Sequence, residues 1–266
     1  MIKKFFSRGY VFLVLAFIYI PIFILVIYSF NQGKTIGVWE SFSLVWYKKL
    51  HEIKDVVLNT VVLAVVSSII ATILGTLGAI GIYYSKGKLG KGVKGLSQIP
   101  VVNSEVVTAC ALVMLFMILG MSHRSMFGLY VGHVLLSAPF VVLSVMPKLK
   151  QMDSSLYEAA LDLGATPTQA LFKVVLPEIL PGVFAGFMLA VTLSLDDYIV
   201  TATLSPLDYD TISTAVYKAI AHSTEKASEK IPIYRALTTI IFLLTVLAVV
   251  VMNVRANKRV KNKRKV

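Results

Sequence analysis

Apolar residues gather in six long stretches, and the charged residues concentrate in the segments between them. A helix that spans a bilayer requires about 20 consecutive, mostly apolar residues. Each stretch meets that length. The pattern therefore predicts an all-α, polytopic membrane protein that forms a single domain over residues 1–266. The expected spans cover residues 10–30, 56–84, 99–119, 126–146, 182–203 and 236–254.

The composition agrees with this pattern and excludes a soluble protein. Hydrophobic residues make up 57% of the chain, charged residues make up 15%, and the mean hydropathy is +0.79. A domain with a water-facing surface does not tolerate so few charges. The formal net charge of +12 does not indicate a nucleic-acid partner, because the basic residues cluster at the ends of the apolar stretches. We expect membrane lipid, and no nucleic acid, around this chain.

The distribution of basic residues predicts the orientation in the membrane. Of the 26 Lys and Arg residues, 17 lie before the first span, in residues 85–95 and 148–181, and after residue 254. The other 9 lie in the opposite loops, where acidic residues mix with them. Cytoplasmic loops of membrane proteins carry the excess of Lys and Arg. Both termini are therefore predicted to be cytoplasmic.

Three acidic residues lie inside the apolar stretches, although four of the six stretches contain no charge at all. The third stretch contains Glu105, and the fifth contains Asp196 and Asp197. An ionised Asp near the centre of a membrane helix costs about 2.5–3.5 kcal/mol, and such residues commonly mark a substrate path. We assign all three acids to a candidate substrate pathway. Hydrogen bonding between helices is the alternative.

Small residues at intervals of four predict where the helices pack against one another, because close packing in lipid depends on such residues. The fifth stretch has a row of them, in which Asp197 projects near the mean direction of the row and Asp196 lies on its flank. Asp197 should thus face protein, and its replacement by Asn should impair uptake more than that of Asp196. A shorter row marks the second stretch as a weaker contact face. The rows are Gly182, Gly186, Ala190 and Ser194, and Ala71, Gly75 and Ala79.

The inner loop over residues 153–177 carries two helix-start signatures, which a simple connector does not require. Ser155 with Glu158 forms a capping-box pattern, and Gly164 stands where a left-handed C-cap is wanted. Thr166 with Gln169 repeats the pattern, with Pro167 at the first helical position. The second short helix is expected to end at residues 176–177. The loop is thus predicted to form a helix-turn-helix elbow that docks a cytoplasmic partner, or else an amphipathic loop at the interface.

The residues of this elbow resemble the EAA signature of binding-protein-dependent ABC importer permeases. The one departure is Val174, where isoleucine is usual. Further segments, Tyr19 to Pro21, Tyr28 to Asn31 and Ser194 to Asp197, are similar to the permeases of spermidine/putrescine importers. The residues that match the signature, and that the resemblance assigns to ATPase coupling, are Glu158, Ala159, Ala160, Gly164, Val174, Leu176 and Pro177.

The resemblance implies a type I importer permease of the bacterial cytoplasmic (inner) membrane. Such a chain forms half of the translocation pore beside a second permease subunit, which makes a heterodimer the expectation. Two cytoplasmic ATPase subunits would bind ATP and Mg²⁺, and an external polyamine-binding protein would deliver the substrate. The elbow would enter a cleft on the ATPase and act as a lever. No cofactor is then expected in this chain.

The chain shows no catalytic chemistry of its own. Residues 33–35 imitate the end of a P-loop, but Tyr28 stands at the position of its first glycine. The four histidines, His51, His123, His133 and His222, have no spacing that predicts a metal site, and we assign them no role. Two alternatives to polyamine import remain: an importer permease for iron or a phosphonate, whose anionic forms the three acids disfavour, and a secondary transporter, which would not require the elbow.

Overall fold

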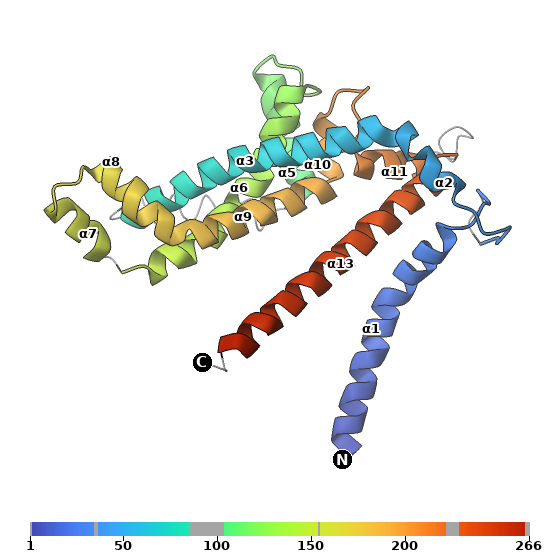
Figure 1. Ribbon diagram of the computed structural model, residues 1–266. Coiled ribbons are helices and arrows are strands. Elements are labelled where there is room, and N and C mark those ends of the chain that lie inside the picture. The colour runs from blue at the N-terminus through green and yellow to red at the C-terminus, as the bar shows by residue number, and fades with distance from the viewer. Residues whose placement is uncertain (1, 35–36, 86–103, 154, 222–228, 264–266) are drawn as a thin grey trace. The chain divides into compact units, whose positions relative to one another are not determined.

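The computed structural model describes residues 2–34, 37–85, 104–153, 155–221 and 229–263 (Figure 1). It divides into two compact units. The first consists of Met1–Asp55 with Val216–Val266, and the second consists of Val56–Ala215. The described residues are almost entirely helical, with one isolated antiparallel bridge between Asn31 and Phe42. The predicted all-α class is confirmed.

Six long helices carry the apolar stretches, and shorter helices connect them. The long helices are α1 (Ile2–Tyr28), α3 (Lys54–Tyr84), α5 (Glu105–Ile118), α6 (Met126–Gln151), α9 (Leu176–Asp196) and α13 (Ile231–Lys263). The shorter ones are α2 (Val45–Lys48), η1 (Lys49–Ile53), α7 (Ser155–Asp162), α8 (Pro167–Ala170), η2 (Leu171–Val175), α10 (Ile199–Leu204) and α11 (Ile212–Ala221). Among the residues that the structure describes, four segments are long and apolar enough to cross a membrane, and the apolar parts of α5 and α13 are shorter.

Helix α6 is the centre of the second unit, and α9 packs closely along it. A Cβ atom built on Gly182 would lie only 2.7 Å from Cγ of Lys148, and one built on Gly186 would lie 3.1 Å from Cγ1 of Val141. The first distance is shorter than real Cβ contacts, and the second is tighter than most of them. The glycines therefore let the two helix backbones approach, as the row of small residues predicted. Ala190 and Ser194 of the same row are also buried.

Helix α3 packs on α6 through the shorter row. A Cβ atom on Gly75 would lie 2.7 Å from Cβ of Val141 and 2.8 Å from the carbonyl oxygen of Ala138. Ala71 and Ala79 are fully buried. The close approach cannot be relieved by a side-chain rotation, because one of the two neighbouring atoms belongs to the backbone. The second stretch is thus a helix-contact face, and the weak signal in the sequence is confirmed.

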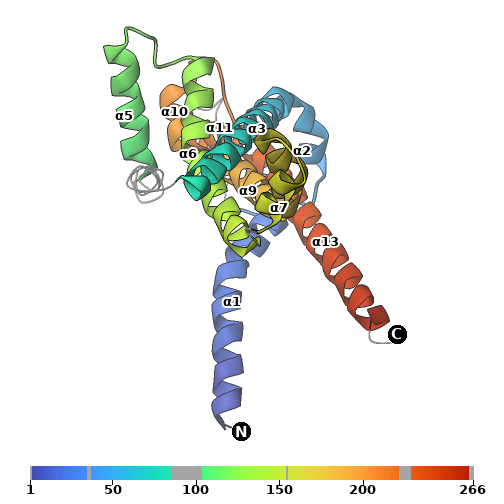
Figure 2. The same ribbon diagram turned by 90° about the vertical axis from the view of Figure 1, so that its left-hand side faces the viewer.

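A second group of contacts joins α5, α6 and α10. Their apolar side chains form one buried cluster of Ala109, Leu112, Phe116, Leu136, Val200 and Leu204. Helices α5 and α6 are neighbours, as Figure 2 shows. The amide N–H of Ser125 donates to the carbonyl oxygen of Leu204 (3.1 Å), which attaches the end of α10 to the start of α6. The short helix α10 is therefore held firmly against two long ones.

In the first unit, Asn31 organises the loop that follows α1. Its Oδ1 accepts the amide N–H groups of Gly33 (3.3 Å) and Glu40 (2.9 Å), and its Nδ2 donates to the carbonyl oxygen of Val38 (2.6 Å). Trp46 donates its indole N–H to the carbonyl oxygen of Asn31 (2.9 Å).

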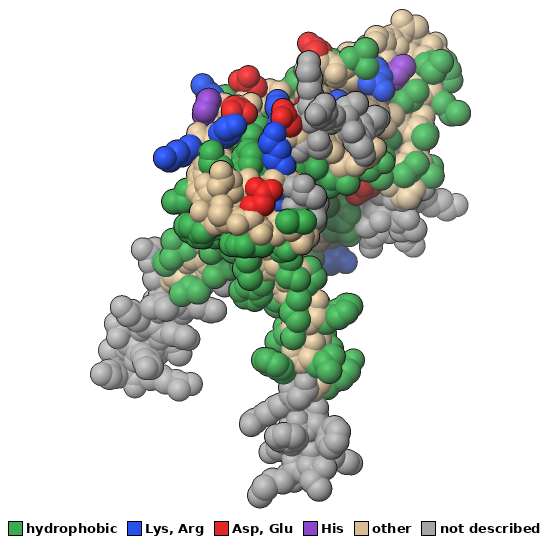
Figure 3. Space-filling model, turned by 90° about the vertical axis from the view of Figure 1, so that its right-hand side faces the viewer, with side chains coloured by type: hydrophobic (Ala, Val, Ile, Leu, Met, Phe, Trp, Pro, Cys, Tyr) green, Lys and Arg blue, Asp and Glu red, His purple; other side chains and the backbone are tan. Residues whose placement is uncertain are grey.

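By contrast, the apolar stretch of α1 has no buried residue. Hydrophobic side chains cover much of the face drawn in Figure 3, whereas the charged ones gather in one region.

Candidate functional site

The fifth predicted span is broken near its end. Residues 182–203 were expected to form one helix, but α9 ends at Asp196 and α10 begins at Ile199. Asp197 has an extended backbone (φ −63°, ψ 127°). The prediction of a continuous span is therefore wrong at this point, for a reason that lies in the Asp197 side chain. A short carboxylate that accepts nearby backbone N–H groups competes with the helix ladder and starts a new helix.

The Asp197 carboxylate caps α10. Its Oδ1 accepts the amide N–H of Val200 (3.2 Å), and its Oδ2 accepts both the amide N–H (2.8 Å) and the hydroxyl (2.8 Å) of Thr201. Asp197 is 4% exposed. The prediction that this residue faces protein is confirmed. Its hydrogen bonds also support the alternative interpretation, in which the acid satisfies neighbouring helices and does not itself meet the substrate.

His133 on α6 links the cap of α10 to α9 and, through Ser194, to α3. One ring nitrogen lies 2.8 Å from the hydroxyl of Ser194, and the other lies 3.0 Å from the hydroxyl of Thr201 and 3.6 Å from Oδ2 of Asp197. Ser194 in turn lies 3.1 Å from the hydroxyl of Ser67 on α3. All five side chains are buried. We call these residues the polar cluster. The sequence interpretation missed His133, although a histidine within an apolar span is itself a signal for a polar network.

The other two acids lie in different surroundings. Asp196 and Glu105 are exposed, at the end of α9 and at the start of α5. Glu105 begins α5, whose apolar side chains pack against α10 beyond the break. The structure thus separates the acids into a buried cap, Asp197, and two accessible carboxylates.

The inner elbow is a second candidate site, and its first helix starts differently from the prediction. The sequence placed the N-cap at Ser155, but Ser155 is already the first helical residue. Its amide N–H donates to Oδ1 of Asp153 (3.0 Å). Backbone and side-chain hydrogen bonds from Ser155 hold the pKa of the Asp153 carboxyl below its usual value. The capping oxygen therefore belongs to Asp153, because a carboxylate is a stronger acceptor than a hydroxyl.

The turn between α7 and α8 agrees with the sequence prediction. Gly164 has φ +85°, its amide N–H donates to the carbonyl oxygen of Leu161 (2.9 Å), and the amide N–H of Ala165 donates to that of Ala160 (3.0 Å). These bonds form a Schellman motif, which normally needs glycine at the left-handed position. The capping box of Thr166 and Gln169 is present as well, at 3.3 and 3.1 Å.

The end of the second elbow helix does not agree. Leu176 and Pro177 were expected to stop it, but the chain continues without interruption from Pro167 into α9. Residues Leu171–Val175 form a π-turn, in which the amide N–H of Leu176 donates to the carbonyl oxygen of Leu171. The wider turn shifts the carbonyl groups with which the Pro177 ring would otherwise clash. The elbow is therefore rigidly continuous with the membrane helix.

The outer surface of the elbow is exposed and partly apolar. No described residue of α7 is buried. Leu163, in the turn after α7, is 89% exposed, and Glu158 and Ala159 on α7 are exposed as well. On the inner side, the Tyr157 ring packs against Tyr84 of α3 at a centroid distance of 5.0 Å. Leu156 on α7 is exposed too, so the outer surface of the elbow carries more than one apolar side chain.

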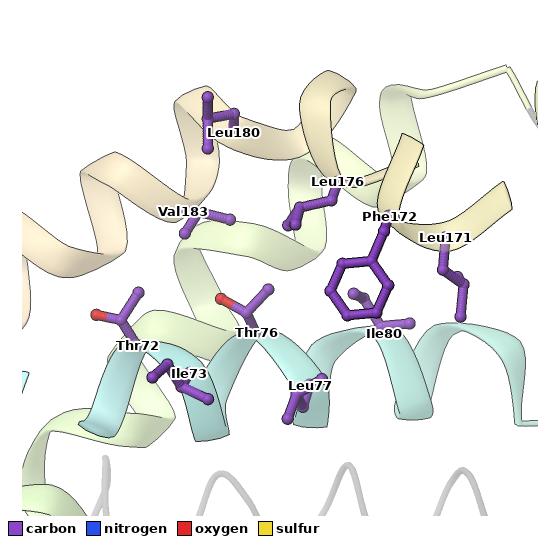
Figure 4. Close-up of a pocket in the computed structure, with 10 residues that line it drawn as sticks. All are labelled: Thr72, Ile73, Thr76, Leu77, Ile80, Leu171, Phe172, Leu176, Leu180 and Val183. Atoms are coloured by element: carbon purple, nitrogen blue, oxygen red, sulfur yellow. The ribbon is translucent and has the colours of Figure 1, made fainter. Parts of the chain in front are cut away.

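Leu176 belongs to the interior and not to this surface. It lines a cavity of about 390 Å³ between α3 and the segment formed by η2 and α9 (Figure 4). Phe172 and Val183 line the same cavity opposite Thr76, and its walls are almost entirely apolar. Of the residues that match the EAA signature, Glu158, Ala159 and Gly164 on α7 and its turn are exposed, as is Pro177, whereas Ala160 is half-buried. Val174 and Leu176 are half-buried in the continuous helix.

The broken membrane helix and the capped elbow together define a transport subunit, and comparison with known proteins identifies its family. Residues 71–262 match the family described as the binding-protein-dependent transport system inner membrane component. The chain belongs to this family. It is a multi-pass inner-membrane permease of a binding-protein-dependent ABC importer, and it is a non-enzymatic subunit that works with another permease, an ATPase and a binding protein.

Particular relatives extend over nearly the whole chain. The chain is 33% identical to the spermidine/putrescine transport system permease protein PotC of Haemophilus influenzae, over 95% of this chain and 96% of that protein. It is 32% identical to the putrescine transport system permease protein PotI of Escherichia coli strain K12, over 77% of this chain and 76% of that protein.

Solved structures share the fold. One is a crystal structure of a bacterial ABC transporter involved in the import of the acidic polysaccharide alginate. The TM-score is 0.65 at 18% identity, with 93% of this chain and 94% of that chain covered. Another shows inward-facing conformations of the MetNI methionine ABC transporter, with a TM-score of 0.60 at 19% identity over 77% of this chain and 94% of that chain.

Proposed function

We propose that the chain is a permease subunit for import of the polyamines spermidine and putrescine. The observation that carries this proposal is the 33% identity to a spermidine/putrescine permease over 95% of the chain. The site supports it, because the accessible side chains near the α9–α10 break include the carboxylates of Asp196 and Glu105. Negative charge in a low-dielectric path attracts a polycation and repels an anion. Iron chelates and phosphonates with net negative charge are disfavoured for the same reason.

The assembly that we propose is a heterodimer with a second permease, two cytoplasmic ATPase subunits and an external polyamine-binding protein. This chain supplies half of the pore. The exposed part of the elbow, with Glu158, Ala159 and Gly164, contacts an ATPase, where ATP and Mg²⁺ are bound. Because the elbow is continuous with α9, a shift of the ATPase surface is transmitted along that helix to the break at Asp197.

The experiment is uptake by the reconstituted importer. Liposomes that contain the complete complex, with the binding protein outside and ATP inside, should accumulate radiolabelled spermidine or putrescine above a control without ATP. An unlabelled polyamine should compete for uptake, whereas a phosphonate should not. ATP-dependent accumulation of an anion, with no accumulation of either polyamine, would overturn the polyamine assignment and leave the family unchanged.

We also propose that both termini and the elbow are cytoplasmic, on the basis of the positive charge in those segments. Two exposed leucines offer matched positions for labelling: Leu163 on the elbow, 89% exposed, and Leu207 in the loop after α10, 80% exposed. In a variant whose native Cys110 is replaced by Ser, an impermeant thiol reagent added to intact cells should label Leu207→Cys and not Leu163→Cys. The opposite pattern would invert the topology. Residues 86–95, whose charges contribute to the prediction, lie outside the described residues.

A further inference from the structure

A groove of about 440 Å³ lies in the first unit between α1, α11 and α13. Most of its walls are apolar, with Ile24 and Leu25 from α1 and Thr238 from α13 among the lining residues. Tyr28, Tyr234 and Arg235 line it as well. The groove thus combines an apolar wall with one cationic side chain. Neither the elbow nor the polar cluster takes part in it.

Arg235 is an unusual residue for such a wall, because it is only 8% exposed and incompletely paired. Its Nη2 donates to the carbonyl oxygen of Lys34 (3.2 Å), but its buried Nε and Nη1 have no acceptor within the described part of the chain. Glu229, the acid beside this region, is bound to Nζ of Lys34 at 2.7 Å. The hydrogen bond from Lys34 also lowers the pKa of the Glu229 carboxyl. A buried cation without a counter-charge is costly, so the described part of the chain leaves this guanidinium in need of an anion.

The order of the lining residues matches the layers of a membrane leaflet. Arg235 lies four residues after Ile231, the first residue of α13, which places it about 6 Å along the helix axis. The headgroup layer on each side of the hydrocarbon core is about 5–8 Å thick. Tyr28 ends α1, and Tyr234 precedes Arg235, as expected for the aromatic belt at the interface. Ile24 and Leu25 lie about one turn deeper along α1, where hydrocarbon is expected.

We propose that this groove is a binding site for an anionic phospholipid. The phosphate accepts hydrogen bonds from Nε and Nη1 of Arg235, in the two-point geometry that guanidinium and phosphate share. An acyl chain lies along Ile24 and Leu25. One lipid molecule thus neutralises the buried charge and covers the apolar wall of the groove. A carboxylate from the second permease would satisfy the guanidinium alone, and the layered order of the walls therefore favours the lipid.

Native mass spectrometry tests the site on the assembled importer in nanodiscs with a fixed fraction of phosphatidylglycerol. The wild-type complex should retain phosphatidylglycerol after gentle release, and Arg235→Ala should reduce the retained amount at least fivefold. Arg235→Lys, which keeps the charge and loses the two-point geometry, should fall between them. Lys230→Ala, which removes an exposed charge on the same side, is the matched control and should retain as much as wild type. Equal retention by Arg235→Ala and wild type would overturn the proposal.

A second measurement needs no variant and so does not depend on the folding of Arg235→Ala. A photoactivatable phosphatidylglycerol in the wild-type complex should form adducts that peptide mapping places on the groove, at residues such as Ile24, Leu25 and Thr238. Adducts spread evenly over the exposed surface of α1 would indicate bulk lipid only and would overturn the site. A chemical cross-link from Arg235 to an acidic residue of the second permease, with the groove free of lipid adducts, would do the same.

Discussion

Replacement of Asp197 by alanine is expected to destabilise the assembled importer by about 2–4 kcal/mol. The substitution removes the acceptor of three hydrogen bonds and leaves the amide groups of Val200 and Thr201 buried and unpaired. An unpaired buried donor costs about 1–3 kcal/mol, and hydrogen bonds between membrane helices are worth about 0.6–2 kcal/mol. The measurement is the yield of purified complex and its thermal midpoint. Asp197→Asn keeps one accepting oxygen and a side chain that caps helices well, so it should lose less.

Asp196 provides the matched control for this prediction, because it is the next residue and is exposed. Asp196→Asn should change the stability by no more than about 0.5 kcal/mol, as is usual for an exposed position. Its uptake of spermidine, normalised to assembled complex, should fall at least tenfold if the carboxylate attracts the polycation. We therefore expect the opposite of the ranking that the sequence favoured. If Asp197→Asn assembles as well as wild type and yet transports less than Asp196→Asn, Asp197 is a substrate contact and the original ranking is right.

The coupling between Asp197 and His133 can be measured in the same system. Their side chains lie 3.6 Å apart and share Thr201 as a hydrogen-bond partner. Substitutions at residues in one network are not additive, and interaction energies of about 0.5–3 kcal/mol are typical. The double variant His133→Ala with Asp197→Ala should therefore lose less stability than the two single variants lose together. Additive losses would show that His133 does not support the cap.

The sequence predicted the membrane helices well because their length and apolar character are local properties. It also predicted the packing rows, since a glycine such as Gly75 or Gly182 leaves room that only a neighbouring backbone can use. The Schellman turn at Gly164 followed from a short helical period that ends in glycine. In each of these cases one residue type has one dominant physical role at that position. The local sequence therefore predicts the feature without knowledge of distant contacts.

The features that the sequence did not predict depend on contacts between distant residues or on a choice between equivalent caps. The Asp197 carboxylate accepts local hydrogen bonds at the break and also lies 3.6 Å from His133, 64 positions earlier in the chain, and a charged residue in a span is compatible with either a cap or a pathway. The π-turn before Pro177 depends on the hydrogen bonds of several successive backbone groups, and no single residue type determines it. Asp153 and Ser155 are both good capping residues two positions apart, and the pattern alone does not choose between them.

Replacement of Gly164 by valine is expected to uncouple ATP hydrolysis from uptake without loss of the membrane helices. Gly164 has φ +85°, and a Cβ atom there would meet nothing within 4 Å, so the penalty is the backbone conformation itself. A side chain in the left-handed region costs about 1–2 kcal/mol, and a β-branched one is especially disfavoured. Because 1.4 kcal/mol is a factor of ten in a population, the correct turn should become roughly tenfold rarer relative to alternatives. Uptake per ATP hydrolysed by the assembled complex should fall accordingly.

Two further variants distinguish the role of the elbow in coupling from a general effect of backbone strain. Gly120→Val creates the same kind of strain, since Gly120 has φ +69° and equally open surroundings, but it lies between α5 and α6, away from the elbow. It should leave the ratio of uptake to ATP hydrolysis unchanged. Gly164→Asn should retain more coupling than Gly164→Val, because asparagine tolerates the left-handed region. If Gly164→Val co-purifies with the ATPase and transports as wild type does, the elbow is not the coupling element. If Gly120→Val loses coupling to the same extent, the loss reflects strain and not the position of the turn.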